Sequence, residues 1–75
     1  MIEGMKNLIE GIKEQKRNIK EHIADIESMI ANNEISEDYI ENYKNEIKQW
    51  NTVIEELNRK EKTMTEAIQI LEEEE

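Results

Sequence analysis

The chain has 75 residues and a net charge of −9, charged residues occupy 39% of its positions, and it contains no cysteine and no proline. A chain of this length forms one small domain at most, and the absence of cysteine excludes disulfides and thiolate metal sites. The acidic balance disfavours binding to nucleic acid and to anionic membrane surfaces, and no stretch approaches the ~20 apolar residues of a membrane span.

Apolar residues recur at alternating intervals of three and four along the first half of the chain. The row is interrupted only at Lys16 and consists of Ile2, Met5, Ile9, Ile12, Lys16, Ile19, Ile23, Ile26 and Ile30. This spacing is the a and d pattern of a heptad repeat, which is typical of helices that pack along a narrow seam. It predicts a helix over about residues 2–32, and the absence of proline permits its length.

The pattern then stops, and the segment 33–36 predicts a turn. Asparagine tolerates the left-handed backbone conformation that often ends helices, and Asn32 and Asn33 stand at this point. Ser36 is a favourable N-cap residue, and the two acidic residues after it lie where the dipole of a second helix favours negative charge. We therefore expect the second helix to begin at about residue 37.

The same spacing resumes beyond the turn, interrupted only at Glu61. The second row consists of Ile40, Tyr43, Ile47, Trp50, Ile54, Leu57, Glu61, Met64, Ile68 and Leu71. It predicts a helix over about residues 37–71, roughly 50 Å long, followed by an acidic tail at 72–75 that the helix dipole causes to fray. A short connection between two long helices implies an all-α fold, an antiparallel two-helix coiled-coil hairpin forming a single domain over residues 1–75.

The register of the hairpin follows from pairing position a of one helix with position d of the other. When the numbers of the partners sum to 73, every layer of the seam is filled. This register places Lys16 and Glu61 in adjacent layers, and we interpret them as a polar pair that sets the register rather than as a catalytic pair. A shift of one heptad, to a sum of 66, would stack Lys16 on Trp50 and leave Ile68 and Leu71 without partners, so it ranks second.

The two flanks of the seam differ in polarity. Positions e are polar, whereas positions g are half apolar, and in an antiparallel hairpin the g rows of both helices lie on one side. We call this surface the g side, and its residues are Met1, Leu8, Gln15, His22, Met29, Tyr39, Glu46, Val53, Lys60 and Ala67, with Gly4, Gly11 and Ile70 at neighbouring c positions. A stripe covering a, d and g is wider than a two-stranded seam needs. We therefore expect a homodimer that forms a four-helix bundle, with completion of the core by another protein as the alternative.

Eight residues are expected at this partner or dimer interface: Leu8, His22, Met29, Tyr39, Val53, Ala67, Ile70 and Trp50. Trp50 is bulky for a two-helix seam, so we expect it either in the core of a wider bundle or as a partly exposed binding anchor. His22 has too few neighbouring ligands for a protein zinc site. Gly4 and Gly11 either weaken the first helix slightly or admit a second helix close beside Leu8.

No set of residues indicates catalysis, because most carboxylates map to the outer positions of the helices and no phosphate-binding or calcium-binding loop is present. We expect no enzyme activity, cofactor, metal or small-molecule substrate. The expected function is a cytoplasmic, non-catalytic protein-protein interaction module, acting as a regulator, inhibitor or adaptor, and its acidic faces favour a basic partner.

Two other functions remain open. The first is a nucleic-acid-mimicking inhibitor of a DNA- or RNA-binding protein, of the mobile-element or phage type, which would use Glu41, Glu55, Glu56, Glu66 and the run 72–75. Interleaved lysine and arginine residues dilute this acidic field. The second is a direct RNA-binding hairpin dimer, which would use Lys6, Lys13, Lys20 and Lys44. It ranks lower because the rest of the molecule repels phosphate.

Overall fold

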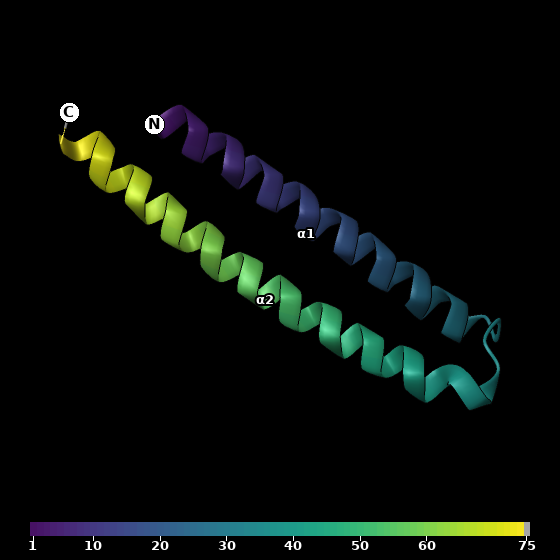
Figure 1. The fold of residues 1–75 in the computed structure, drawn as a ribbon. Helices are drawn as coiled ribbons and strands as arrows, with labels where there is room; N and C mark the ends of the chain where they lie inside the picture. The colour runs from purple at the N-terminus through teal and green to yellow at the C-terminus, as the bar shows by residue number, and fades with distance from the viewer. Residues whose placement is uncertain (75) are drawn as a thin grey trace.

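Two antiparallel helices make up the protein in a computed structural model that describes residues 1–74 (Figure 1). Helix α1 spans Ile2–Ala31 and helix α2 spans Glu37–Glu74. They lie side by side, with the connection at one end of the hairpin and the start of α1 beside the last turns of α2 at the other. The predicted all-α hairpin is therefore confirmed.

The hairpin is a rod rather than a sphere. Its principal extents are 58 × 15 × 13 Å and its radius of gyration is 17.2 Å, whereas a compact domain of this length has a radius of gyration of about 11 Å. Every a and d residue of the two heptad rows is buried or half-buried. The buried residues are Ile9, Ile23, Ile26, Leu57 and Ile68. Within residues 1–74 no large side chain is completely enclosed, because two helices cover only one stripe of each other.

Contacts between side chains of the two helices fix the register. The Lys16 ammonium donates to a Glu61 carboxylate oxygen and, at 2.9 Å, to the Asn58 side-chain oxygen. These contacts agree with the register in which partners sum to 73. In the register that sums to 66, Lys16 and Glu61 would lie about 16 Å apart along the hairpin axis, so that alternative is wrong.

The first helix ends in a hydrogen-bonded cap built around Asn33. This residue has φ 58°, the left-handed conformation that asparagine tolerates better than most residues. Its N–H donates to the Ile30 carbonyl at 3.2 Å, and the N–H of Glu34 donates to the Met29 carbonyl at 2.9 Å. Both bonds satisfy carbonyls that the helix end would otherwise leave unpaired, which is the Schellman arrangement. The helix ends at Ala31, one residue earlier than the sequence predicted.

The second helix begins where the sequence predicted and ends later. Ser36 directly precedes it, and the Ser36 carbonyl accepts a hydrogen bond from the Tyr39 N–H at 2.9 Å. Residues 72–74, which the sequence predicts as an acidic tail, belong to the helix, which extends to Glu74 instead of ending at about residue 71. Glutamate is a good helix former, and Glu72 lies 3.8 Å from the Lys6 ammonium of α1. Glu75 lies outside the described residues.

The left-handed conformation of Asn33 makes a specific prediction about stability. Replacing Asn33 by alanine should lower the free energy of unfolding by about 1 kcal/mol, because a Cβ-bearing residue without a side-chain amide is strained there, whereas Asn33→Gly should be neutral or stabilising. The matched control is Asn32→Ala, because Asn32 has φ −89°. Urea denaturation monitored by circular dichroism measures the stability of all three variants. Equal losses of stability in Asn33→Ala and Asn32→Ala would contradict the strain expected at Asn33.

Candidate functional site

Large exposed apolar side chains gather on the g side of the hairpin. Those of the described residues are Met1 at 93% exposure, Leu8 at 62%, Met29 at 36%, Tyr39 at 58% and Ile70 at 57%. All five belong to the g side as the sequence defined it. The opposite flank, with its e positions, contributes none of them. The hairpin therefore has one apolar flank that its own fold leaves open to solvent.

The two helices contribute unequally to this surface. On α2 the g residues Glu46, Val53 and Ala67 are half-buried, whereas every g residue of α1 is exposed. Of the eight predicted interface residues, five are thus exposed (Leu8, His22, Met29, Tyr39 and Ile70) and three are partly covered (Trp50, Val53 and Ala67). Seven of the eight belong to the g side, whereas Trp50 is a seam residue.

The exposed apolar residues form one patch at each end of the g side. The turn-end patch consists of Met29 and Tyr39, and it borders an open groove of about 300 Å³ lined by Met29, Glu34, Ile35, Ser36, Tyr39 and Tyr43. The open-end patch consists of Met1, Leu8, Ala67 and Ile70. Leu8 and Met29 are about 32 Å apart along α1. A partner that covers both patches must therefore run along most of the hairpin.

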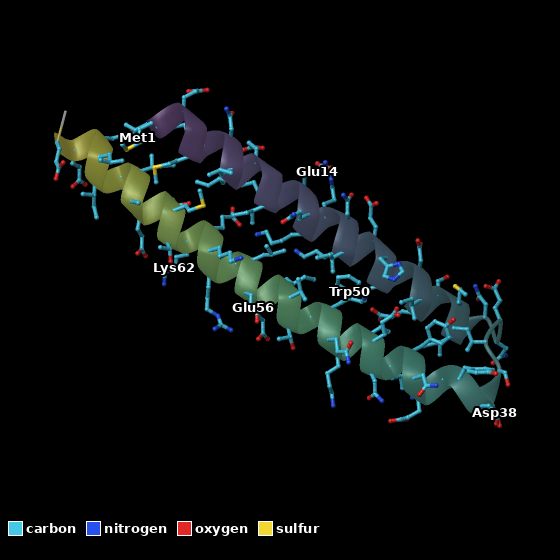
Figure 2. All side chains as sticks on the ribbon, in the orientation of Figure 1. Met1, Glu14, Asp38, Trp50, Glu56 and Lys62 are labelled. Atoms are coloured by element: carbon cyan, nitrogen blue, oxygen red, sulfur yellow. The ribbon has the colours of Figure 1, made fainter. Side chains whose placement is uncertain are left out.

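A polar cluster separates the two patches. The rings of His22 and Trp50 form a T-shaped pair with 5.9 Å between ring centroids and 84° between the ring planes. The His22 Nε2 lies 3.4 Å from a Glu46 carboxylate oxygen. Trp50 points from α2 into the space between the helices (Figure 2), so it is a half-buried seam residue in contact with the His22 ring.

Glu46 is a site residue whose contact the sequence analysis missed. It was assigned to the polar part of the g row, but its pairing with His22 was not predicted. The heptad pattern contains the information needed to predict this pairing. The g residues of both helices lie on one side, and the residue numbers 22 and 46 sum to 68, close to the sum of 73 for partners across the seam. Asn58 was missed for a similar reason, since an e residue beside Leu57 can reach the Lys16 ammonium.

Charge is nearly balanced along the g rows although the chain carries −9. Among their ten residues, Glu46 is the one acidic side chain and Lys60 is the one lysine or arginine. Other faces carry most of the acidic groups, and Figure 2 shows Glu56 and Lys62 on the side of α2 that faces away from α1. A partner can therefore approach the g side without meeting a concentrated negative field.

The Lys16–Glu61 pair lies inside the seam and is mostly covered, with side-chain exposures of 16% and 20%. The hydrogen bond from Lys16 lowers the pKa of Glu61, and attraction to Lys16 and Lys13 adds to this against the opposing effect of desolvation. A carboxyl group whose pKa is lowered stays ionised at neutral pH, which suits a structural ion pair and not a general acid. This arrangement agrees with the interpretation of the pair as register-setting.

Neither glycine of α1 lies against another part of the hairpin. A Cβ added at Gly4 or Gly11 would meet no atom within 4 Å. Across residues 1–74, no group of three or more histidine or carboxylate side chains is arranged to hold a metal ion. Neither α1 nor the described part of α2 combines the length and the apolar character needed to cross a bilayer.

The lowered pKa of Glu61 predicts a pH-dependent contribution to stability. Because the folded-state pKa lies below the ordinary value of 4.5, the contribution is complete above pH 4.5 and is lost as the pH falls through the lowered pKa. Glu61→Gln should therefore be less stable than the parent at pH 7, and the difference should shrink at about pH 3. Urea denaturation at both pH values measures this, with Glu56→Gln as the exposed control. If the free energies of unfolding of Glu61→Gln and of the parent differ by the same amount at both pH values, the lowered pKa of Glu61 is contradicted.

Comparisons with protein-family models, with curated proteins and with solved structures find no match to this chain. The g side consists of two apolar patches on a rigid hairpin, separated by a polar cluster. Its exposed apolar side chains lie near both ends of the hairpin.

Proposed function

We propose that the protein is a non-catalytic protein-protein interaction module whose g side docks onto a protein partner. The observation that supports this proposal is the placement of all five large exposed apolar side chains of residues 1–74 on that one side. Scattered exposed apolar residues are normal on a protein, but apolar residues gathered on one face and bordered by polar ones mark interaction sites. The partner covers these side chains and removes them from water.

The scaffold suits this role because it holds the surface in place before binding. Both helices are continuous, and the seam between them is fixed in register by Lys16 and Glu61. Docking onto preordered helical faces loses less conformational entropy than docking of a flexible segment. The contact is a helix-face interaction, in which residues spaced seven apart along each helix meet one partner surface.

The acidic faces outside the g side contribute to partner choice. The chain carries −9, and the g rows account for almost none of it. A partner with an apolar face bordered by basic side chains matches this distribution, because complementary charge at the rim raises association rates and excludes other partners. A module of this kind acts as a regulator, inhibitor or adaptor in the cytoplasm.

The test is a comparison of two triple variants with equal changes in charge. Leu8→Lys, Tyr39→Lys and Val53→Lys alter the g side, whereas Asn7→Lys, Asn51→Lys and Thr65→Lys alter exposed positions elsewhere. Proteins captured by the parent chain from a lysate of its own cells should be lost, by roughly tenfold or more, with the g-side variant only. Circular dichroism verifies that both variants remain helical.

Two outcomes would contradict the proposal in different ways. Equal capture by the g-side variant and by the parent excludes the g side as the docking surface. Equal loss of capture with both triple variants, together with a steep decrease of binding as salt is raised, indicates that the acidic field carries the interaction. That second outcome would favour the nucleic-acid-mimicking inhibitor instead.

A further inference from the structure

We infer that the g side docks onto a second copy of this chain, in a two-fold dimer whose turns lie at opposite ends and whose axis passes beside Val53. This inference rests on the proposed function, because it names the partner of the same surface. In this arrangement α1 lies antiparallel to α1 of the second copy, and α2 lies antiparallel to α2. The dimer is a four-helix bundle in which the g sides of the two copies face each other.

The g row of α2 is complementary to itself about Val53. A two-fold axis at this position brings together residues whose numbers sum to 106. Val53 then meets Val53 of the second copy, and Tyr39 meets its Ala67. Glu46 meets Lys60 of the second copy, so the two charged residues of the row form ion pairs of opposite sign. Every apolar residue of this row obtains an apolar partner, which is the condition that an isologous interface must satisfy.

The g row of α1 is complementary to itself in the same arrangement. Leu8, exposed at 62%, meets Met29 of the second copy, exposed at 36%, and Gln15 meets its His22. The numbers of these pairs sum to 37, so their axis lies between residues 18 and 19. In one hairpin, Val53 is level with residue 20 of α1, because partners across the seam sum to 73. The two axes therefore coincide to about 2 Å along the bundle.

The position of this axis also gives the largest overlap between two copies. It lies near the middle of both helices, so the turn-end patch of each copy covers the open-end patch of the other. These patches contain the five large exposed apolar side chains of residues 1–74. A chain this short, with only five buried core residues among residues 1–74, is of the kind that oligomerisation commonly stabilises.

The alternative dimer has its axis along the bundle, so that α1 of one copy lies beside α2 of the other and both turns share one end. Leu8 would then meet Ala67, but Met29 would meet Glu46 and His22 would meet Val53, which leaves two apolar residues against polar ones. It would also place the acidic ends of both α2 helices, Glu72 to Glu74, at the same end of the bundle. In the antiparallel dimer these ends are separated by most of the 58 Å length of the rod, well beyond the Debye length of about 8 Å at physiological salt.

Charge exchange at positions 46 and 60 tests the arrangement. In one chain Glu46 and Lys60 lie about 21 Å apart along α2, so they cannot pair within a hairpin. Glu46→Lys alone places lysine against lysine across the dimer, and Lys60→Glu alone places glutamate against glutamate. Each single variant should raise the dissociation constant of the dimer roughly tenfold, and an equimolar mixture of the two should restore it, because the mixed dimer regains both pairs of opposite charge.

Sedimentation equilibrium measures these constants, and the expected mass of the parent is twice the chain mass of 9.0 kDa. A parent that remains at 9.0 kDa up to high micromolar concentration would overturn the inference. A mixture of the two variants that dimerises no better than either alone would also overturn it. The double variant Glu46→Lys/Lys60→Glu provides a control, since its homodimer should match the parent.

Crosslinking gives an independent measurement, since the natural chain has no cysteine. Val53→Cys should join two copies through a short bis-maleimide in high yield, because the axis passes beside this position. Asn51→Cys, two residues away on the opposite flank, is the matched control and should remain largely uncrosslinked. Equal yields from the two variants would exclude the proposed axis.

Failure of this inference can be distinguished from failure of the proposed function. If the parent is monomeric but capture of another protein still depends on the g side, a different protein occupies the surface and the docking function stands. If the parent neither dimerises nor loses its captured partner when the g side is altered, both proposals are wrong.

Discussion

The burial of one apolar stripe on each helix, along the seam between α1 and α2, is the constraint on which the rest of the structure depends. This stripe turns along each helix with a seven-residue period, so it determines which residues can meet and which are left outside. The five buried residues all belong to it. Because a two-helix seam is centred on the a and d positions, the apolar residues at g are left exposed or only half-buried. The open surface of this protein is thus a direct result of how its core is built.

Because the core is thin, the polar pair Lys16 and Glu61 contributes more to specifying the register than it would in a larger domain. Isoleucine-rich layers are similar to one another, and a slip of one heptad would still place apolar residues together over most of the seam. A lysine in one helix and a glutamate in the other satisfy each other in only one register, and Asn58 takes a further hydrogen bond from the lysine. The pair therefore contributes specificity, and the placement of the g residues beside each other follows from it.

The sequence was sufficient to predict the hairpin, its register and the exposed flank, because each depends on a period that is repeated many times. Single contacts were harder. The pairing of His22 with Glu46 depends on how two side chains bend across the g side, and a heptad assignment does not include side-chain conformation. The helical state of 72–74 was missed because an unfavourable dipole at a helix end is a small effect, which the helix propensity of glutamate and the nearby Lys6 outweigh.

The short cap at Asn33 has a consequence for the order in which the hairpin assembles. The layer that joins Ile30 to Tyr43 closes a loop of about a dozen residues, whereas the layer that joins Ile2 to Leu71 closes nearly the whole chain. The entropy of loop closure rises with loop length, so contacts form first beside the cap and then extend toward the termini. Opening proceeds in the reverse order. Met29 and Tyr39 are consequently held on the most persistent part of the molecule, and Leu8 and Ile70 on the part that separates first.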